Sequence, residues 1–302
     1  MADPNSNGSS SSTLTVAPPV ASANARRRSP LPLAILAALF IIVPFLTWYA
    51  TWFGRELSDE DTGKYLMEEN NPRHVQHALS QIAERLDRKD SSVRRWYPQI
   101  VKQAGNPSTE IRLTTAWLMG KDNKSEEFHA TLPGLLTDTE PIVRRNAALS
   151  LSTFGDARGR DELRAMLQPF TVVSTNEGSI GSILTEGSAV RAGALLARLT
   201  LQNDEMQEIR SPVPGIISKA LLGEGAKVKT GDALLVLSPD AESVWEALRA
   251  LLLVGQAEDL SLVQKYAEGE AKMPLKVKEQ AVQTALAIKD RQKNTTAPAP
   301  PG

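Results

Sequence analysis

One short pattern that occurs twice constrains the fold of this chain more than any other feature. The pattern G-x-x-V-x-x-G-x-x-L is found first in EGSAVRAGALL and again, 38 residues later, in EGAKVKTGDALL. The residues that define the two copies are Gly187, Val190, Gly193 and Leu196, and then Gly225, Val228, Gly231 and Leu234. Paired glycines allow the positive φ angles of tight turns. The duplication therefore predicts short strands joined by turns, and alternating polar and apolar residues extend this region over 170–239.

The two copies divide the region into two halves, and a further glycine stands at the beginning of each half. This glycine is Gly178 in the first half and Gly215 in the second. This arrangement resembles the hammerhead pattern of the biotinyl/lipoyl domain, which is also called the barrel-sandwich hybrid. The resemblance implies an all-β domain over residues 170–239. The side chains expected to fill its small sandwich core are Val190, Leu196, Val228 and Leu234.

The position that would carry a cofactor holds the wrong residue for that task. In biotinyl carriers of this family the modified lysine lies five residues before the isoleucine of a segment like EIRSPVPG, and here that isoleucine is Ile209. Five residues back is Asp204, whose carboxylate cannot form the amide that attaches biotin or lipoate. The lysines of this region, Lys219, Lys227 and Lys229, all belong to the second half. We therefore expect no cofactor, and the modified carrier is the alternative.

Unmodified domains of this type occur in the membrane-fusion, or periplasmic adaptor, proteins of efflux pumps and secretion systems. The stretch IRSPVPGIISK, followed by GEGAKVKTGDALLVL, is similar to theirs, as is the N-terminal anchor before the domain. Adaptors insert a long coiled-coil hairpin between the two halves, whereas only TLQNDEMQEIRSP separates them here. In addition, no β-barrel stretch follows Pro239. We therefore expect a scaffold that does not dock through a long hairpin.

The beginning of the chain predicts a tail and a membrane span. Residues 1–30 are rich in Ser, Asn, Pro, Ala and Gly, a composition that predicts a disordered tail. Residues 31–53 contain no charge. As a helix they would reach about 34 Å, enough to cross a hydrocarbon core of about 30 Å, with a kink at Pro44. We expect a transmembrane anchor here, and a cleavable signal peptide is the alternative.

Charges beside the predicted anchor indicate its orientation. Arg26, Arg27 and Arg28 precede it, and an acidic linker follows at residues 54–70. The positive-inside rule keeps the arginines in the cytoplasm. The expected localisation is therefore the inner cell membrane, with a single span, a cytoplasmic N-terminus and the main part of the chain in the periplasm.

Residues 71–169 show a helical repeat. The segments STEIRLTTAWLMG and EPIVRRNAALSLSTFG align at an offset of 32, and a looser copy begins at NPRHVQHALSQIAERL. Such a period is typical of a solenoid in which each helix pair packs only against its neighbours. The pattern resembles HEAT repeats of the short, HEAT-like type. We expect Arg144 and Arg145 to be solvated and to bond turn carboxylates such as Asp138.

Helical spacing returns after the strands, over residues 240–291, and a polar, proline-rich stretch at 292–302 predicts a second disordered tail. The run from Leu251 to Val254 is expected to form a buried helix face. Two helix pairs alone bury too little apolar surface to be stable. We therefore predict an α+β chain of several domains, in which the helices after Asp240 stack on the earlier ones and the β domain is inserted into one α-solenoid.

Composition excludes several classes of function. A net charge of −1 offers no basic surface for nucleic acid. The absence of cysteine excludes disulfides, thiolate metal sites and a cysteine nucleophile. His74 and His77 share one helix face but have no third histidine near them, so we expect no metal site. The sequence contains neither a phosphate-binding loop nor a nucleophile elbow, so we expect no catalytic residue.

The function that these features predict is that of a non-catalytic adaptor or scaffold. Residues 31–53 would hold it in the lipid bilayer, and its helical repeats and β domain would bind protein partners of the cell envelope, in an efflux or secretion assembly. The alternative is a biotin- or lipoate-type carrier, or an accessory subunit of an enzyme complex. The sequence leaves the oligomeric state open.

Overall fold

The computed structural model describes residues 31–50, 56–68, 70–269 and 272–296. The chain divides into two units, Met1–Arg55 and Glu56–Gly302. The predicted tail at 1–30, the last three residues of the predicted anchor and residues 297–302 lie outside the described residues. The fold mixes helix and sheet, with a helical repeat region and two antiparallel four-stranded sheets.

The first unit contains helix α1 (Leu31–Ala50), which includes Pro44. Leu39, Phe40, Ile41 and Ile42 follow one another along it, and all four side chains are exposed. Because four consecutive residues point to every side of a helix, this part of α1 has no polar face. Among the residues whose side chains are described, no helix combines the length and the hydropathy of a membrane span.

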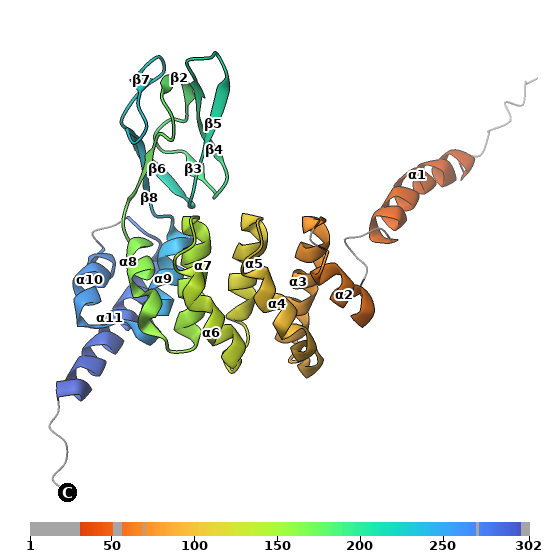
Figure 1. Cartoon of the computed structure of the whole chain (residues 1–302), viewed down its shortest axis with the longest axis horizontal. Helices are drawn as coiled ribbons and strands as arrows, with labels where there is room; N and C mark the ends of the chain where they lie inside the picture. Colours follow the sequence, from red (N-terminus) through yellow and green to blue (C-terminus); the bar gives the residue numbers. More distant parts are fainter. Residues whose placement is uncertain (1–30, 51–55, 69, 270–271, 297–302) are drawn as a thin grey trace, which may run out of the picture. The chain divides into compact units, whose positions relative to one another are not determined.

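Helices of the second unit form a row in which each helix packs against the next. The members of this row are α3 (Pro72–Asp87), α5 (Thr109–Met119), α7 (Pro141–Thr153), α9 (Ala241–Val254) and α11 (Leu275–Thr296). The helices that pack against the row are α4 (Tyr97–Gln103), α6 (Glu126–Leu135), α8 (Arg160–Ala165) and α10 (Leu260–Glu268). Figure 1 shows α3, α5 and α7 side by side. Short 3₁₀ helices at η1 (Ser91–Trp96), η2 (Ala157–Gly159) and η3 (Ala257–Asp259) join neighbouring helices.

The repeat of 32 residues is visible in the hydrogen bonds of its turns. Arg112 Nη1 donates to the carbonyl oxygens of Asn106 and Pro107, at 3.0 and 3.1 Å. One repeat later, Arg144 Nη1 makes the same pair of bonds to the turn before α7, at 2.8 and 3.3 Å. Each arginine therefore satisfies turn carbonyls and ties the turn to the helix that follows it.

The strands between α8 and α9 form two antiparallel sheets, with the orders β1-β8-β6-β3 and β5-β4-β2-β7. Their bounds are β1 (Phe170–Val173), β2 (Gly178–Ile183), β3 (Ala189–Val190), β4 (Leu195–Thr200), β5 (Met206–Arg210), β6 (Gly215–Ala220), β7 (Lys227–Val228) and β8 (Ala233–Ser238). The buried side chains of both sheets form one cluster whose members all lie between Phe170 and Leu237. This region therefore has a core of its own.

An approximate two-fold relation connects the two sheets. Each strand of one sheet corresponds to the strand four places earlier or later in the other sheet: β1 to β5, β2 to β6, β3 to β7 and β4 to β8. With this correspondence the order β1-β8-β6-β3 becomes β5-β4-β2-β7. The hydrogen bonds follow the same exchange, since Gly187 N–H donates to Ile217 O at 2.8 Å and Gly225 N–H donates to Ile180 O at 2.7 Å. A register irregularity occurs both between β2 and β4 and between β6 and β8. The sequence duplication is therefore a structural duplication.

The helices before and after the strands share a second core. Leu163 and Leu167 precede the strands, Val244 and Leu248 follow them, and all four belong to one buried cluster. Helix α9 packs on both α7 and α8. Tyr266 of α10 donates its buried hydroxyl to the carbonyl of Leu167 at 2.7 Å. The C-terminal helices therefore pack on the helices that precede the strands, as the predicted solenoid requires.

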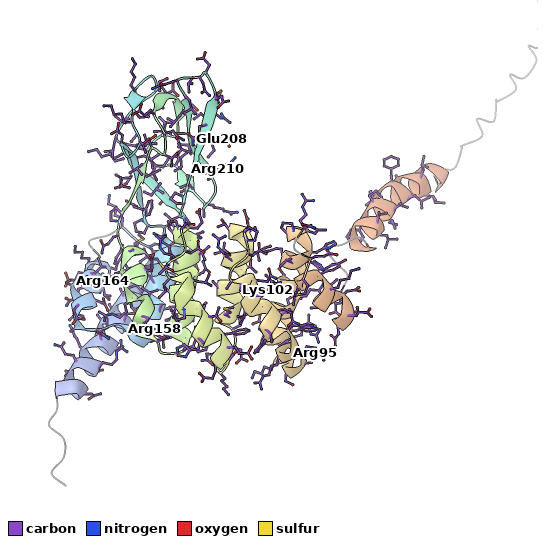
Figure 2. All side chains as sticks on the ribbon, viewed as in Figure 1. Arg95, Lys102, Arg158, Arg164, Glu208 and Arg210 are labelled. Carbon is purple, nitrogen blue, oxygen red and sulfur yellow. The ribbon has the colours of Figure 1, made fainter. Side chains whose placement is uncertain are left out.

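A buried ion pair also joins the two helical segments. Asp259 is fully buried, and Arg160 Nε donates to its carboxylate at 3.0 Å. Arg164, labelled in Figure 2, lies 3.6 Å from the same carboxylate. The carboxylate also accepts the backbone N–H of Gln256 at 2.8 Å, where it caps η3. Hydrogen bonds from Arg160 and from the Gln256 N–H, together with the nearby charge of Arg164, thus compensate the cost of burying this carboxylate.

We expect Asp259→Ala to lower the free energy of unfolding of the second unit by about 3 kcal/mol, because it removes the buried carboxylate that pairs with the partly buried Arg160 and caps η3. Urea unfolding followed by circular dichroism measures the loss. Glu258→Ala is the matched control, because Glu258 binds the same Arg160 at 3.0 Å but is 65% exposed. The control should lose less than about 1 kcal/mol. Equal losses for the two variants would show that burial does not strengthen the Asp259 contact.

Two boundaries differ from those that the sequence suggests. The expected linker at 54–70 contains helix α2 (Asp59–Leu66), capped by Ser58 Oγ, which accepts the N–H of Asp61. Its acidic first turn suits the positive end of the helix dipole, and Leu66 is buried in the core of the array.

The expected tail at 292–302 begins too early, because α11 continues to Thr296. Arg291 anchors this end by donating to three carbonyls at the end of α9.

Candidate functional site

The residues of the duplicated pattern occupy the turns and the core of the β domain. The glycines in the left-handed region, with φ of 85°, 79°, 82° and 90°, are Gly187, Gly193, Gly225 and Gly231. The buried apolar positions are Val190, Leu196, Val228 and Leu234. A Cβ at Gly178 or Gly215 would lie 2.5 or 2.7 Å from the carbonyl oxygen of Thr200 or Ser238. These ten residues therefore shape the domain and do not form a chemical site.

The hairpin between β4 and β5 carries Asp204, the residue that the sequence pattern aligns with the lysine of a carrier domain. Its turn is closed by the Leu201 N–H, which donates to Glu205 O at 2.8 Å, and by the Asp204 N–H, which donates to Leu201 O at 3.1 Å. Asp204 is exposed and has a φ of 61°, which aspartate tolerates better than most residues. The tip therefore presents a carboxylate to solvent where a carrier presents an amine.

We expect Asp204→Lys to remain unmodified when the chain is co-expressed with a biotin or lipoate ligase, because Glu205, Met206 and Gln207 differ from the flanks of a carrier lysine. Intact-mass spectrometry measures the outcome, and a mass increase equal to the cofactor would contradict it. The variant should also lose about 1 kcal/mol of stability, since lysine fits a positive φ less well than aspartate. Asp204→Asn, the matched control, should keep the stability of the parent.

Beside the tip, the exposed face of β4 and β5 carries an ionic cluster. Glu208 lies 2.5 Å from Arg210 Nη2 and 3.7 Å from Arg198 Nη2. Figure 2 labels Glu208 and Arg210, which lie two residues apart on β5. Exposed ion pairs contribute little stability, so this cluster makes the sheet polar there and is available for contacts with a partner.

A groove of about 420 Å³ crosses the row of helices. Its apolar lining comes from Trp117 of α5, Leu149 of α7 and Leu253 of α9, and Gln280 of α11 also lines it. Trp117 is 46% exposed and Leu253 is 52% exposed. Large apolar side chains that remain exposed together in a hollow are typical of a binding surface.

Close approach of α5 and α7 forms one wall of this groove. A Cβ at Gly120 would lie 2.5 Å from Ser150 Oγ, so glycine is required there. Ser150 Oγ in turn donates to the carbonyl of Ala116 at 2.7 Å. This contact holds Trp117 at the groove and fixes the spacing of the two helices.

Charged groups frame the apolar lining. Lys121 Nζ lies 4.3 Å from the centre of the Trp117 ring, which is within the range of a cation–π interaction. The pKa of Glu246 is raised, first by desolvation from the atoms around the carboxyl and then because Glu242 and Asp240 lie near it. Arg249, which also lines the groove, acts in the opposite direction on that pKa. The groove is therefore bordered by Glu246, by Arg249 and by Lys121, whose ammonium also binds the Asp87 carboxylate at 2.8 Å.

The expectation of a buried face over residues 251–254 holds for only part of the run. Leu251 and Val254 are buried in the second core, whereas Leu252 and Leu253 line the groove. Four consecutive residues cannot share one helix face, because each turns about 100° from the last. The prediction therefore did not identify Leu253 as a groove residue. Its position on the helix, turned away from Leu251 and Val254, could have indicated that it is exposed.

The expectation that Arg144 and Arg145 are solvated is wrong for Arg145, which is 5% exposed. Its pKa is lowered by burial, while Glu162 and Asp240 oppose that effect. Arg144 is only partly buried and binds the Glu162 carboxylate at 2.6 Å, and the Asp138 carboxylate binds Arg112 instead. Arg145 is covered because α9 packs on α7, a contact that the sequence of a single repeat does not indicate.

The two neighbouring histidines have local structural partners. His74 contacts the Glu68 carboxylate and stacks on Tyr65, with ring centres 3.9 Å apart. His77 Nε2 lies 3.1 Å from Gln81 Nε2. Over the described part of the chain, no three His, Cys, Asp or Glu side chains gather in a group that could hold a metal ion.

Comparison with known proteins supports the helical part of this description. Residues 97–173 match the HEAT-repeat family, which confirms a HEAT-like repeat region. No curated protein matches the chain. Among solved structures, one described as a single-chain, multi-domain long-chain acyl-CoA carboxylase is 20% identical, with a TM-score of 0.23. That similarity covers 43% of this chain and 14% of the carboxylase chain, and it carries no argument about function.

Proposed function

We propose that this protein is a non-catalytic scaffold that binds protein partners of the cell envelope. The observation that carries the proposal is the exposure of Trp117 and Leu253 in one groove, built from helices on both sides of the strands. Tryptophan is one of the residues that most often supply the binding energy at protein interfaces, and exposed apolar side chains around it mark an interaction surface. Because α5, α7 and α9 are packed against one another, the groove is formed before a partner arrives, which lowers the entropic cost of binding.

The β domain is proposed as an unmodified barrel-sandwich hybrid that provides a second binding surface. The two-fold relation of its sheets and its positive-φ glycines support this assignment. Asp204 at the tip argues for recognition through the surface rather than through a bound cofactor. The resemblance of IRSPVPGIISK to periplasmic adaptors supports an efflux or secretion assembly as the setting.

Residues 31–53 are proposed as an anchor in the inner membrane. The apolar side chains that α1 exposes on every side from Leu39 to Ile42 support it, because a helix without a polar face suits lipid better than water. Arg26, Arg27 and Arg28 before the helix support a cytoplasmic N-terminus. The second unit would then act in the periplasm.

A reporter fused after Gly302 is expected to be active only outside the cytoplasm. Alkaline phosphatase at this position should be active, and green fluorescent protein should stay dark. Replacing Arg26, Arg27 and Arg28 with glutamate should mix the two orientations, because these charges carry most of the bias. A silent phosphatase together with bright cytoplasmic fluorescence would contradict the proposed orientation.

Quantitative co-purification from native membranes tests the binding function. Leu253→Glu places a charge in the groove and should remove the partners that the parent retains. Met67→Glu is the matched control, because Met67 is 45% exposed but lies outside the groove. Partners retained equally by both variants, or no partner with the parent, would refute the groove as the binding surface.

A carrier or an accessory subunit of an enzyme complex is the second candidate. It predicts that the chain isolated from its native cell has a mass above that of the bare polypeptide. An unmodified mass under these conditions would remove the carrier hypothesis and leave the scaffold in place.

A further inference from the structure

Helix α11 exposes an apolar stripe on its outer face. Leu275, Val282 and Leu286 are 68%, 42% and 56% exposed. Together with the exposed Glu279 and Lys289, they follow alternating steps of four and three residues along the helix. These steps place all five side chains on one side, in the pattern of a coiled-coil seam. We call this set the α11 seam.

No other segment of the described part of the chain covers the α11 seam. The opposite face of α11 packs on α9 and α10, and its buried residues are Val277, Ala281, Thr284, Ala285 and Ile288. Neither Glu279 nor Lys289 forms an ion pair with any residue that the structure describes. The last helix of a solenoid normally carries a polar outer face, because no further repeat covers it. An apolar seam at this place indicates a partner helix.

The charge pattern of the seam is complementary to itself. When two α11 helices lie antiparallel with residue 284 of both at the same level, Val282 of each lies opposite Leu286 of the other. At the same register, Glu279 of each lies opposite Lys289 of the other. The apolar side chains of Val282 and Leu286 then meet each other, Leu275 lies opposite Lys293, and the Glu279 and Lys289 layers join opposite charges. A parallel pair would instead place Glu279 against Glu279 and Lys289 against Lys289.

We propose that the partner is a second copy of this chain, held through an antiparallel pair of α11 helices. Such a contact is closed by a two-fold axis, so it produces a dimer and not a fibre. A further pair of opposite charges lies beside the seam in this register, because Lys276 of one copy comes near Asp290 of the other. The seam is separate from the groove, which involves α11 only through Gln280. The dimer would therefore carry two grooves, one on each copy.

Disulfide crosslinking of the full chain in membranes tests the register. The chain contains no cysteine, so every crosslink reports an introduced site. When copies with Val282→Cys and copies with Leu286→Cys are produced together, the mixed crosslink should exceed either homotypic crosslink at least threefold. The reason is that a homotypic pair in this register is displaced by about 6 Å along the axis. Homotypic crosslinks that dominate, or no crosslink above that of Met67→Cys, would overturn the proposal.

A charge exchange tests the pairing independently. Glu279→Lys and Lys289→Glu each place like charges in both charged layers, and each should weaken dimerisation at least about tenfold. The double variant restores opposite charges and should dimerise within about twofold of the parent. Both residues are exposed, so equal melting temperatures are expected for all four proteins at concentrations at which each is monomeric. Unchanged dimerisation in the single variants, or no recovery in the double variant, would overturn the self-pairing.

Discussion

Truncation after Pro239 is expected to leave a protein that does not hold its native fold. The shortened chain keeps Leu163 and Leu167 but loses Val244 and Leu248, which cover them in the second core. It also leaves Arg160 without the buried carboxylate of Asp259. Exposing this core removes several kcal/mol of the free energy that burial of apolar surface contributes, which is comparable to the whole free energy of unfolding of a domain. The truncated chain should therefore aggregate or melt at a much lower temperature.

The matched experiment deletes residues 170–239 instead and joins the ends with a short Gly/Ser linker. Phe170 lies opposite Leu237 in the β1–β8 pair, so the chain leaves and re-enters the helices at neighbouring points. The deleted protein should therefore remain folded and monomeric at low concentration. Size-exclusion chromatography and thermal unfolding distinguish the two forms. A truncated chain as stable as the parent would mean that the two helical segments are independent.

Val228→Asp is expected to unfold the β domain while the helices persist. Val228 is 4% exposed and lies in the core that both sheets share. A carboxylate without a partner at this site should cost about 4 kcal/mol or more, which exceeds the stability that so small a core can lose. Limited proteolysis should then cleave within 170–239, whereas the helical signal in circular dichroism should remain.

Lys227→Asp is the control for this prediction, because its side chain is exposed on the same strand. It should resist proteolysis as the parent does. Loss of the helical signal together with the β domain would show that the two cores unfold as one unit. Equal sensitivity of the two variants would show that the assignment of inward and outward faces is wrong.

Residues whose role depends on local backbone geometry could be predicted from the sequence. Gly187 and Gly225 mark their turns because a positive φ excludes most other residues, and the 38-residue offset carries this information without a structure. Arg112 and Arg144 behave alike for the same reason, since the bonds that each donates to the carbonyls of its own turn stay within one repeat.

Residues whose environment depends on distant packing could not be predicted. Arg145 has the pattern of a surface arginine, but it is buried because α9 returns to α7 after the strands. Trp117 and Leu253 have the helical spacing of core residues, and only the layout of the helix row leaves them exposed. Helix α2 was missed because its acidic sequence resembles a linker, whereas buried Leu66 and Thr62 and the ion pair between Asp59 and Arg85 attach it to the array.

Site-specific photocrosslinking in living cells tests the proposed scaffold function most directly. A photoreactive amino acid at position 253 places the probe in the groove, and the same residue at position 67 places it on an exposed apolar site elsewhere. The scaffold predicts discrete adducts with one or a few proteins at position 253, lost when Trp117→Ala is added, and none of them at position 67. Absence of adducts at position 253, or the same adducts at both positions, would contradict it.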